Sequence, residues 1–254
     1  MTGAAGTLTA IHRHPVKALG TQALTAVTLR AGECLPGDRV WALAHEKTAF
    51  DWDAPAWTRC SVFLRGATIP ALMAVTAEGA PGGPITFRHP DRPVLTVDPA
   101  TPEGEAALIA WTDPLIPAGL PRPARLAAAP GRGMTDSPAP TVSILSDASR
   151  RALEAAAGRP LDRRRFRGNL WLDGLSPWAE FDLVGQDVRL GAARLRVTER
   201  IGRCSATHAD PDTGRRDLDL LDPLDRGQGH TDFGVFAEVT VGGDVALGDA
   251  LRPV

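Results

Sequence analysis

One cysteine and a group of arginines are the residues of this chain whose types and spacing suggest chemistry. Cys204 lies between Arg200 and Arg203, and more arginines come shortly before it in the sequence: Arg163, Arg164, Arg165 and Arg167. A thiolate is the reactive, metal-binding form of cysteine, and neighbouring cations favour it. A soft thiolate beside guanidinium groups suits a metal carried on an anionic cofactor. The alternative is a half-buried cysteine at a strand end, with the arginines on a solvated face.

Several short motifs surround this cysteine in a fixed order. FRGNLWLDG begins at Phe166, and GRCSATHADPDTG ends at Gly214. In chain order the pattern consists of Phe166, Arg167, Asn169, Glu180, Gly191, Arg203, Cys204, Thr207, Asp210, Pro211, Thr213 and Gly214. This pattern resembles the MOSC family, the domain found at the C-terminus of molybdenum-cofactor sulfurases. The ending FGVFAEVTVGGDVALGD, which begins at Phe233, is similar to the terminal strands of that family.

The N-terminal part carries a second resemblance. HPVKAL, which contains Lys17, and GDRVW, which contains Arg39, are similar to motifs of the β-barrel domain that often precedes MOSC domains. The resemblance implies that Lys17 and Arg39 contact the phosphate of a pterin cofactor, and lysine and arginine are the usual protein partners of phosphate. Ala18 departs from the family pattern, which often has a hydroxyl residue there, so one phosphate hydrogen bond is in doubt. His12 and His14 are expected to be ordinary barrel-surface or interface residues.

The MOSC resemblance also implies a cofactor and a reaction. Cys204 would ligate molybdenum held by a molybdopterin-type cofactor in a cleft between the two halves. The other cofactor-binding residues would be Arg167, Asn169 and Arg203, with Lys17 and Arg39 on the phosphate. Proteins similar to this chain, such as the mitochondrial amidoxime-reducing component, reduce N-hydroxylated compounds, while the metal carries the oxygen chemistry. We therefore expect a molybdenum oxidoreductase acting on a small N-hydroxylated substrate.

The electrons of such a reductase would come from a separate protein of the ferredoxin, flavodoxin or cytochrome type. The chain lacks the four-cysteine spacing of an iron–sulfur cluster, and it has no G-x-G-x-x-G motif that opens a helix after a strand. The main alternative is a protein that carries molybdenum cofactor or sulfur without reducing a substrate. A β-barrel with a degenerate, empty site is a third interpretation, which the departure at Ala18 keeps open.

The elements that must position these residues are mostly short strands. Residues 7–98 alternate apolar and polar positions in several short runs, which predicts a meander or barrel. Residues 99–140 are rich in proline and alanine and are predicted to be a connection, with a short helix at Glu103–Trp111. Ser146 is a suitable N-cap for a helix over Ala148–Ala157, which Gly158 and Pro160 would end. A hairpin is predicted to turn near Gly191.

The expected fold class is therefore mostly β (α+β). A β-barrel MOSC core at 141–254 would follow a smaller N-terminal MOSC-type β domain at 1–98 and the connection at 99–140, with a few short helices. RFRGNLWLD, at 165–173, is predicted to form one strand.

Composition limits the remaining possibilities. The chain has 254 residues and a formal net charge of -2, so it gives no global signal for binding nucleic acid. Three separated cysteines form no disulfide framework, and this fits a cytoplasmic protein. The N-terminus lacks the pattern of a secretory signal, and no long apolar run predicts a membrane span.

Overall fold

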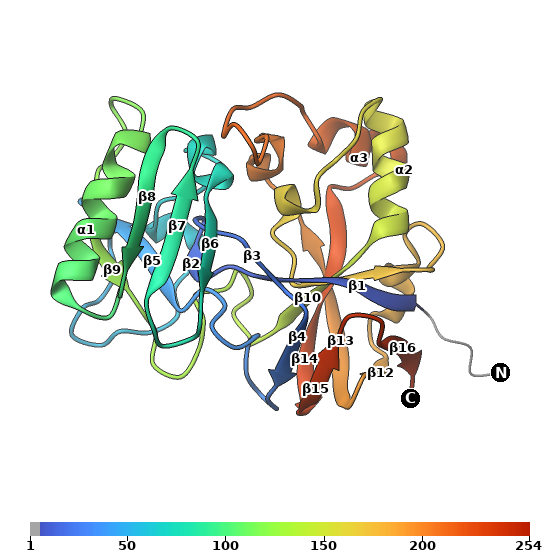
Figure 1. The fold of residues 1–254 in the computed structure, drawn as a ribbon. Helices are drawn as coiled ribbons and strands as arrows, with labels where there is room; N and C mark the ends of the chain where they lie inside the picture. The colour runs from blue at the N-terminus through green and yellow to red at the C-terminus, as the bar shows by residue number, and fades with distance from the viewer. Residues whose placement is uncertain (1–5) are drawn as a thin grey trace.

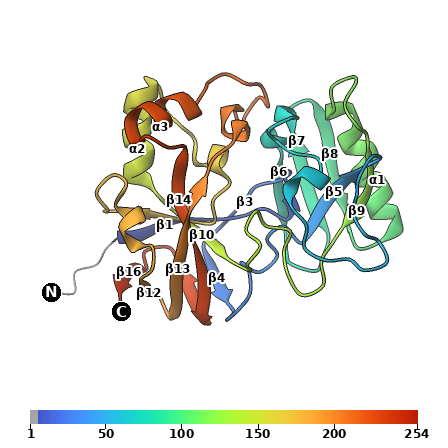
Figure 2. The same ribbon diagram turned by 180° about the vertical axis from the view of Figure 1, so that it is seen from behind.

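The computed structural model describes residues 6–254, and strands dominate them. Figures 1 and 2 show two lobes side by side, with the strands β10 and β13–β16 in one lobe and β5–β9 in the other. The helices within the described range are α1 (Pro102–Thr112), α2 (Asp147–Ala157) and α3 (Leu221–Gln228). The prediction of a mostly β fold with a few short helices is confirmed.

A closed barrel of seven strands forms one lobe. Its strands, in order around the barrel, are β11 (Leu170–Asp173), β10 (Val142–Ser146), β14 (Asp232–Val241), β13 (Ala193–Gly202), β12 (Asp187–Leu190), β16 (Ala250–Pro253) and β1 (Gly6–Arg13). Closure comes from β1, which pairs antiparallel with both β11 and β16. Side chains alternate across each strand, so Leu8, Ile144 and Val197 meet in a buried interior.

Three short strands extend the barrel lobe. They are β3 (Gln22–Leu24), which pairs with β1, and the pair β4 (Ala26–Leu29) and β15 (Gly243–Ala246). The hairpin predicted near Gly191 joins β12 to β13, where Gly191 has a φ of 56°. A positive φ costs glycine nothing, so the sequence marks this turn correctly.

The second lobe contains two sheets of three strands. One consists of β2 (Val16–Lys17), β5 (Trp41–His45) and β9 (Pro123–Ala127). The other consists of β6 (Thr76–Gly79), β7 (Ile85–His89) and β8 (Arg92–Val97). Helix α1 contributes Leu108 and Trp111 to the core of this lobe, where they join Phe87. Thr101 caps α1 by accepting a 3.0 Å hydrogen bond from the amide of Gly104.

The predicted caps of helix α2 are present in the structure. Ser146 Oγ accepts a hydrogen bond from the amide of Ser149 over 3.3 Å, and Gly158 ends the helix with a φ of 73°. Residues 165–173 differ from the single strand that we predicted. They begin within the 3-10 turn η4 (Arg163–Phe166), pass through Arg167 with a left-handed φ of 49°, and become the strand β11 only at Leu170. The difference turns Arg167 out of the sheet.

Strand pairing runs across the domain boundaries predicted from sequence. The strand β1 lies in the predicted N-terminal domain 1–98 but closes the barrel built from 141–254. The strand β9 lies in the predicted connection 99–140 and pairs with β5. The three-part division stays a prediction.

Candidate functional site

A cavity of about 540 Å³ is lined by residues of both lobes. All six residues singled out from the sequence line it: Lys17, Arg39, Arg167, Asn169, Arg203 and Cys204. Lys17 belongs to β2 and Arg39 precedes β5, whereas Arg203 and Cys204 follow β13. Residues that are far apart in sequence therefore meet in one place, as a shared site requires.

Lys17 is held at one side of the cavity by two acceptors. Its side chain is 5% exposed, and Nζ donates to the main-chain oxygen of Met134 over 2.8 Å and to Asp136 Oδ1 over 2.5 Å. Asp136 itself is 62% exposed. Its partial enclosure in the cavity opposes ionisation, but Lys17 and Arg39 outweigh this and hold the pKa of Asp136 below its ordinary value. This edge of the cavity therefore carries a fixed ion pair at neutral pH.

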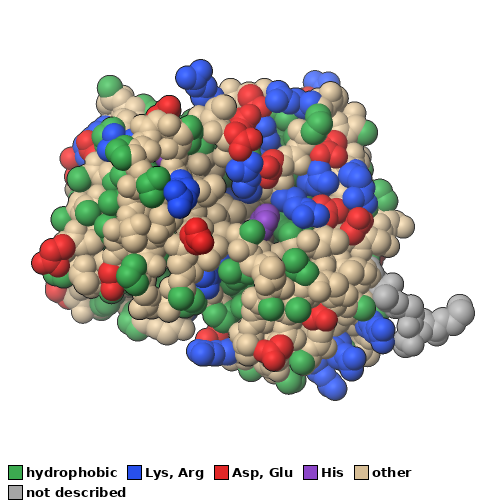
Figure 3. Space-filling model, viewed as in Figure 1, with side chains coloured by type: hydrophobic (Ala, Val, Ile, Leu, Met, Phe, Trp, Pro, Cys, Tyr) green, Lys and Arg blue, Asp and Glu red, His purple; other side chains and the backbone are tan. Residues whose placement is uncertain are grey.

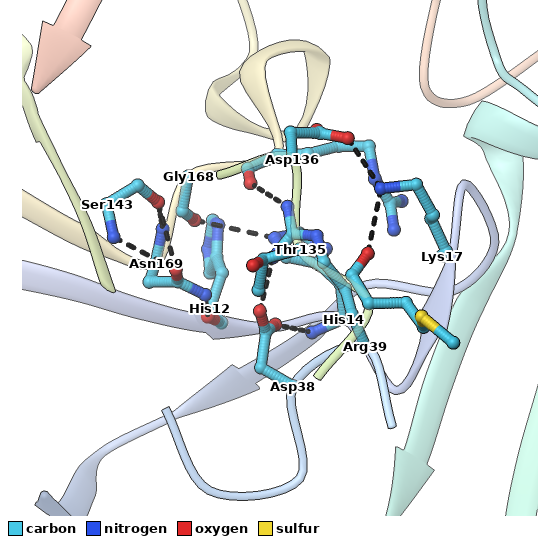
Figure 4. A network of polar contacts seen from close by, with 12 residues as sticks. His12, His14, Lys17, Asp38, Arg39, Thr135, Asp136, Ser143, Gly168 and Asn169 are labelled. Atoms are coloured by element: carbon cyan, nitrogen blue, oxygen red, sulfur yellow. Dashed lines mark hydrogen bonds and ion pairs between the residues drawn. The ribbon is translucent and has the colours of Figure 1, made fainter. Parts of the chain in front are cut away.

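Arg39 is buried and oriented by its neighbour in sequence. Its Nη1 forms an ion pair with the buried Asp38, whose other oxygen accepts a 2.7 Å hydrogen bond from the amide of His14 (Figure 4). Burial opposes the charge on Arg39, yet Asp38 raises its pKa above the ordinary arginine value. Arg39 therefore stays cationic in a fixed position.

Arg167 and Arg203 are held differently, because main-chain oxygens fix them. Arg167 reaches Val16 O from Nη2 over 3.3 Å, and Arg203 donates to Phe166 O from Nη1 over 2.8 Å. Neither has a carboxylate within 4.0 Å among residues 6–254. Burial lowers the pKa of Arg167 to about 9, with Arg39 adding repulsion, and burial lowers that of Arg203 to about 10. Two partly desolvated cations without counter-ions favour an anionic ligand.

Unusual backbone conformations gather at this cavity. Among the described residues, four that are not glycine have positive φ angles, namely Ala18, Arg39, Arg167 and Trp178. The first three of them line the cavity. Left-handed backbone costs an ordinary residue roughly 1–2 kcal/mol, and such strain tends to cluster at ligand sites.

Asn169 is almost fully buried and joins three strands. Its Oδ1 accepts from Ser143 Oγ over 2.9 Å and from the amide of Ser143 over 3.1 Å, while Nδ2 donates to His12 O over 3.1 Å. Asn169, which directly precedes β11, is thereby tied to Ser143 of β10 and His12 of β1 (Figure 4). A direct role of Asn169 in cofactor binding stays a prediction. The second hydrogen on Nδ2 would be available to donate to the cofactor.

The two histidines lie deeper than the surface positions expected from the sequence. His14 is fully buried, and its ring nitrogens lie 3.3 Å from Thr21 Oγ1 and 3.5 Å from Gly168 O. Burial, with the nearby charges of Arg167 and Arg39, holds the pKa of His14 well below its ordinary value. The barrel-surface alternative is wrong for both rings, because His12 is only 9% exposed. The interface alternative stays a prediction. A neutral His14 supports the arginines without adding charge.

Cys204 is exposed and stands at the start of a turn. Its main-chain oxygen accepts a 3.0 Å hydrogen bond from Thr207 Oγ1 and one of 3.1 Å from the amide of Thr207, which fixes the turn η6 (Ser205–His208). No cluster of three or more His, Cys, Asp and Glu side chains suited to a metal ion occurs in the described range.

The arginine-rich run upstream of Arg167 has a structural role instead. Arg163 pairs with Asp147, Arg164 with Asp162 and Asp212, and Arg165 with Asp217. On the face in Figure 3, basic and acidic side chains gather together over the upper part of the barrel lobe. Most of the positive charge in this run is thus neutralised.

Sequence reasoning missed three residues of this region. Cys60 and Arg65 line the cavity from the other lobe, within a loop that carries no recognisable motif. Asp38 was detectable, because it directly precedes Arg39 and a buried arginine needs an acceptor.

Comparison with known proteins finds similarity to, among others, one curated protein and two solved structures. The chain is 36% identical over 84 residues to "Mitochondrial amidoxime-reducing component 1" of Xenopus laevis; the match covers 33% of this chain and 23% of that protein. YiiM of Geobacillus stearothermophilus is 22% identical, with a TM-score of 0.35 over 44% of this chain and 53% of its own. YuaD of Bacillus subtilis is 13% identical, with a TM-score of 0.46 over 100% of this chain and 98% of its own.

The helices of residues 6–254 are all too short or too polar to cross a membrane.

Family models account for most of the sequence. The model of the MOSC N-terminal β-barrel domain matches residues 5–113, and the model of the MOSC domain matches residues 132–252. The chain therefore belongs to the MOSC domain family and carries the N-terminal β-barrel domain of that family.

Proposed function

We propose that this protein binds a molybdenum cofactor through Cys204 and reduces N-hydroxylated compounds with electrons from a separate protein. The observation that carries the proposal is one cavity lined by Cys204, two ion-paired cations and two arginines without carboxylate partners. Membership of the MOSC family and the partial similarity to an amidoxime-reducing component support it.

The residues fit a pterin cofactor that carries a phosphate. Lys17, Arg39 and Arg167 present an ammonium group and two guanidinium groups, the donors that bind phosphate best. Phosphate would give Arg167 the anionic partner that residues 6–254 do not supply. Arg203 would lie nearer to the thiol, since it directly precedes Cys204 in the chain.

The bound cofactor would supply the chemistry that removes oxygen with two electrons. The protein would bind and orient the cofactor and the substrate, and would enclose them in the cavity. In the overall reaction an N-hydroxyl compound takes up two electrons and two protons, the N–O bond breaks, and an amine-type product and water leave. Cys204 would provide the thiolate ligand. Lys17, Arg39 and Arg167 would hold the cofactor by its phosphate. Because Cys204 is exposed, a substrate could reach this residue from solvent.

A second function, that of a cofactor or sulfur carrier, is favoured by the exposure of Cys204. An accessible thiol could release its load to another protein. Both functions need the same binding residues, so only turnover separates them.

The test is metal analysis of protein purified from a host that makes the cofactor, with Cys204→Ala beside it. We expect about one molybdenum per chain in the native protein and a loss of at least tenfold in the variant. The thiol makes no side-chain hydrogen bond with residues 6–254, so the variant should have the melting temperature of the cofactor-free native protein. A chemically reduced electron donor and an N-hydroxylated substrate then give the second readout. Full loading without turnover would favour the carrier. Absence of molybdenum from the native protein would refute the reductase function and favour an empty barrel or a carrier isolated without its load.

A further inference from the structure

One further cation that lines the cavity has no hydrogen-bond or ion-pair partner for its side chain among residues 6–254. Arg65 lines the cavity from the loop before the 3-10 turn η2 (Pro70–Ala74). Its chain neighbours touch the turn that follows Cys204: Ser205 Oγ donates to Ala67 O over 3.4 Å. A Cβ atom added at Gly66 would lie 3.5 Å from Ala206 Cβ. The loop that carries Arg65 therefore faces the thiol end of the cavity.

The guanidinium group of Arg65 differs from the other cavity arginines. Arg39 is paired with Asp38, Arg165 with Asp217, and Arg203 is anchored on two main-chain oxygens. Arg65 is half-buried, and its guanidinium makes no hydrogen bond or ion pair with any residue between 6 and 254. A half-buried, unpaired arginine loses hydration without compensation unless a ligand provides an anion.

The cofactor phosphate already has its own cations in the proposed arrangement. Lys17, Arg39 and Arg167 approach one another, since Arg39 bonds to the main chain of Arg167 and Arg167 to that of Val16. Arg65 lies in the loop that contacts the turn after Cys204. A ligand that reaches Arg65 there would be the reacting molecule, not the cofactor phosphate.

We propose that Arg65 binds an anionic group of the substrate, so that the preferred substrates are N-hydroxylated compounds bearing a carboxylate. This proposal rests on the proposed reductase function. The planar fork of arginine matches a carboxylate in a bidentate manner. Leu64, Met73 and Phe236 also line the cavity and provide apolar contacts for the body of such a molecule.

One carboxylate of the protein competes for this role. Glu199 on β13 also lines the cavity, is exposed and has no cation within 4.0 Å in the described part of the chain. A pair between Arg65 and Glu199 would make Arg65 structural. The substitutions Arg65→Gln and Glu199→Gln separate the two roles.

The test uses loaded protein, a chemically reduced viologen as donor, and two substrates of the same shape. They are 4-carboxybenzamidoxime and its neutral carboxamide. We expect a kcat/KM about 10- to 100-fold higher for the carboxylate, because that is the range for a hydrogen bond to a charged group. Arg65→Gln should remove the preference by raising KM for the carboxylate, with kcat and the neutral substrate unchanged. Arg189→Gln, on the exposed side of β12, is the matched control.

Binding is measured separately from turnover. Calorimetry with 4-carboxybenzamidine, which has no N–O bond to reduce, should show affinity that is about tenfold weaker in Arg65→Gln. An unchanged substrate preference and unchanged affinity in that variant would overturn the proposal. So would an equal loss of melting temperature in Arg65→Gln and Glu199→Gln without any change in preference. If neither substrate is reduced, the reductase function fails, and calorimetry still decides whether Arg65 binds an anion.

Discussion

Arg39 donates a hydrogen bond from Nη2 to the main-chain oxygen of Arg167 over 2.8 Å, which joins the two lobes through two cations of the same cavity. Arg167 completes the connection by reaching back to Val16 O in β2. The relative position of the lobes and the geometry of the anion-binding end are therefore coupled. A ligand that binds both arginines should stabilise the lobe interface as well.

Replacing Asp38 with Asn should destabilise the protein strongly. Arg39 would remain buried with no carboxylate beside it, and breaking a buried ion pair typically costs about 3–5 kcal/mol. Urea unfolding measures the change in the free energy of unfolding. Asp222→Asn removes the partner of Arg226 in an exposed pair and should cost less than about 0.5 kcal/mol. Equal effects of the two substitutions would show that Asp38 does not hold Arg39 in solution.

Substitutions at Ala18 separate backbone strain from hydrogen bonding. Ala18 has a φ of 64°, so Ala18→Gly should raise the free energy of unfolding by about 0.5–1 kcal/mol. Ala18→Ser keeps the strain but adds a hydroxyl donor beside Lys17, so it should bind inorganic phosphate about fivefold more tightly without gaining stability. Urea unfolding and calorimetric titration with phosphate give the two readouts. Tighter phosphate binding in Ala18→Gly alone would contradict this assignment.

Stability should fall as the solution becomes acidic, in part because of His12. Burial, reinforced by the charge of Arg163, lowers the pKa of His12 from 6.5 to about 4. Between these two pH values the unfolded chain binds a proton that the folded protein does not, so the contribution of His12 is complete above pH 6.5 and is lost as pH falls towards 4. The loss is roughly 3 kcal/mol.

Urea unfolding at pH 7 and at pH 4.5 checks this expectation for His12. His12→Gln should show a smaller difference between the two pH values than the native protein does. His45→Gln, at the half-exposed end of β5, is the control and should keep the full difference. If the free energy of unfolding of His12→Gln changes between pH 7 and pH 4.5 as much as that of the native protein, other groups cause the acid sensitivity.

The parts of the fold that sequence reasoning predicts well are those set by short-range signals. Ser146 and Gly158 bound helix α2 through a side-chain cap and a left-handed residue, and both signals are visible in single residues. Gly191 marks the hairpin for the same reason. At the site, the six predicted residues share one cavity, and this placement came from family motifs rather than from residue chemistry.

The parts that sequence reasoning misses depend on distant partners. The strand β9 begins at Pro123 in a proline-rich stretch, and its pairing with β5 outweighs the local turn signals. His12 alternates like a surface residue, but the packing of β1 against β3 and β11 buries it. Arg65 is in no motif at all, and only the approach of the two lobes brings it to the cavity.

Because β1 lies between β11 and β16, the first strand of the described chain completes a barrel whose other members come after residue 141. A fragment that starts there would leave the free edges of β11 and β16 open to pairing with another chain. During synthesis, the barrel cannot close until β16 has emerged from the ribosome and can pair with β1. Such long-range closure slows folding, so the nascent chain should need protection from aggregation until its last strand is made.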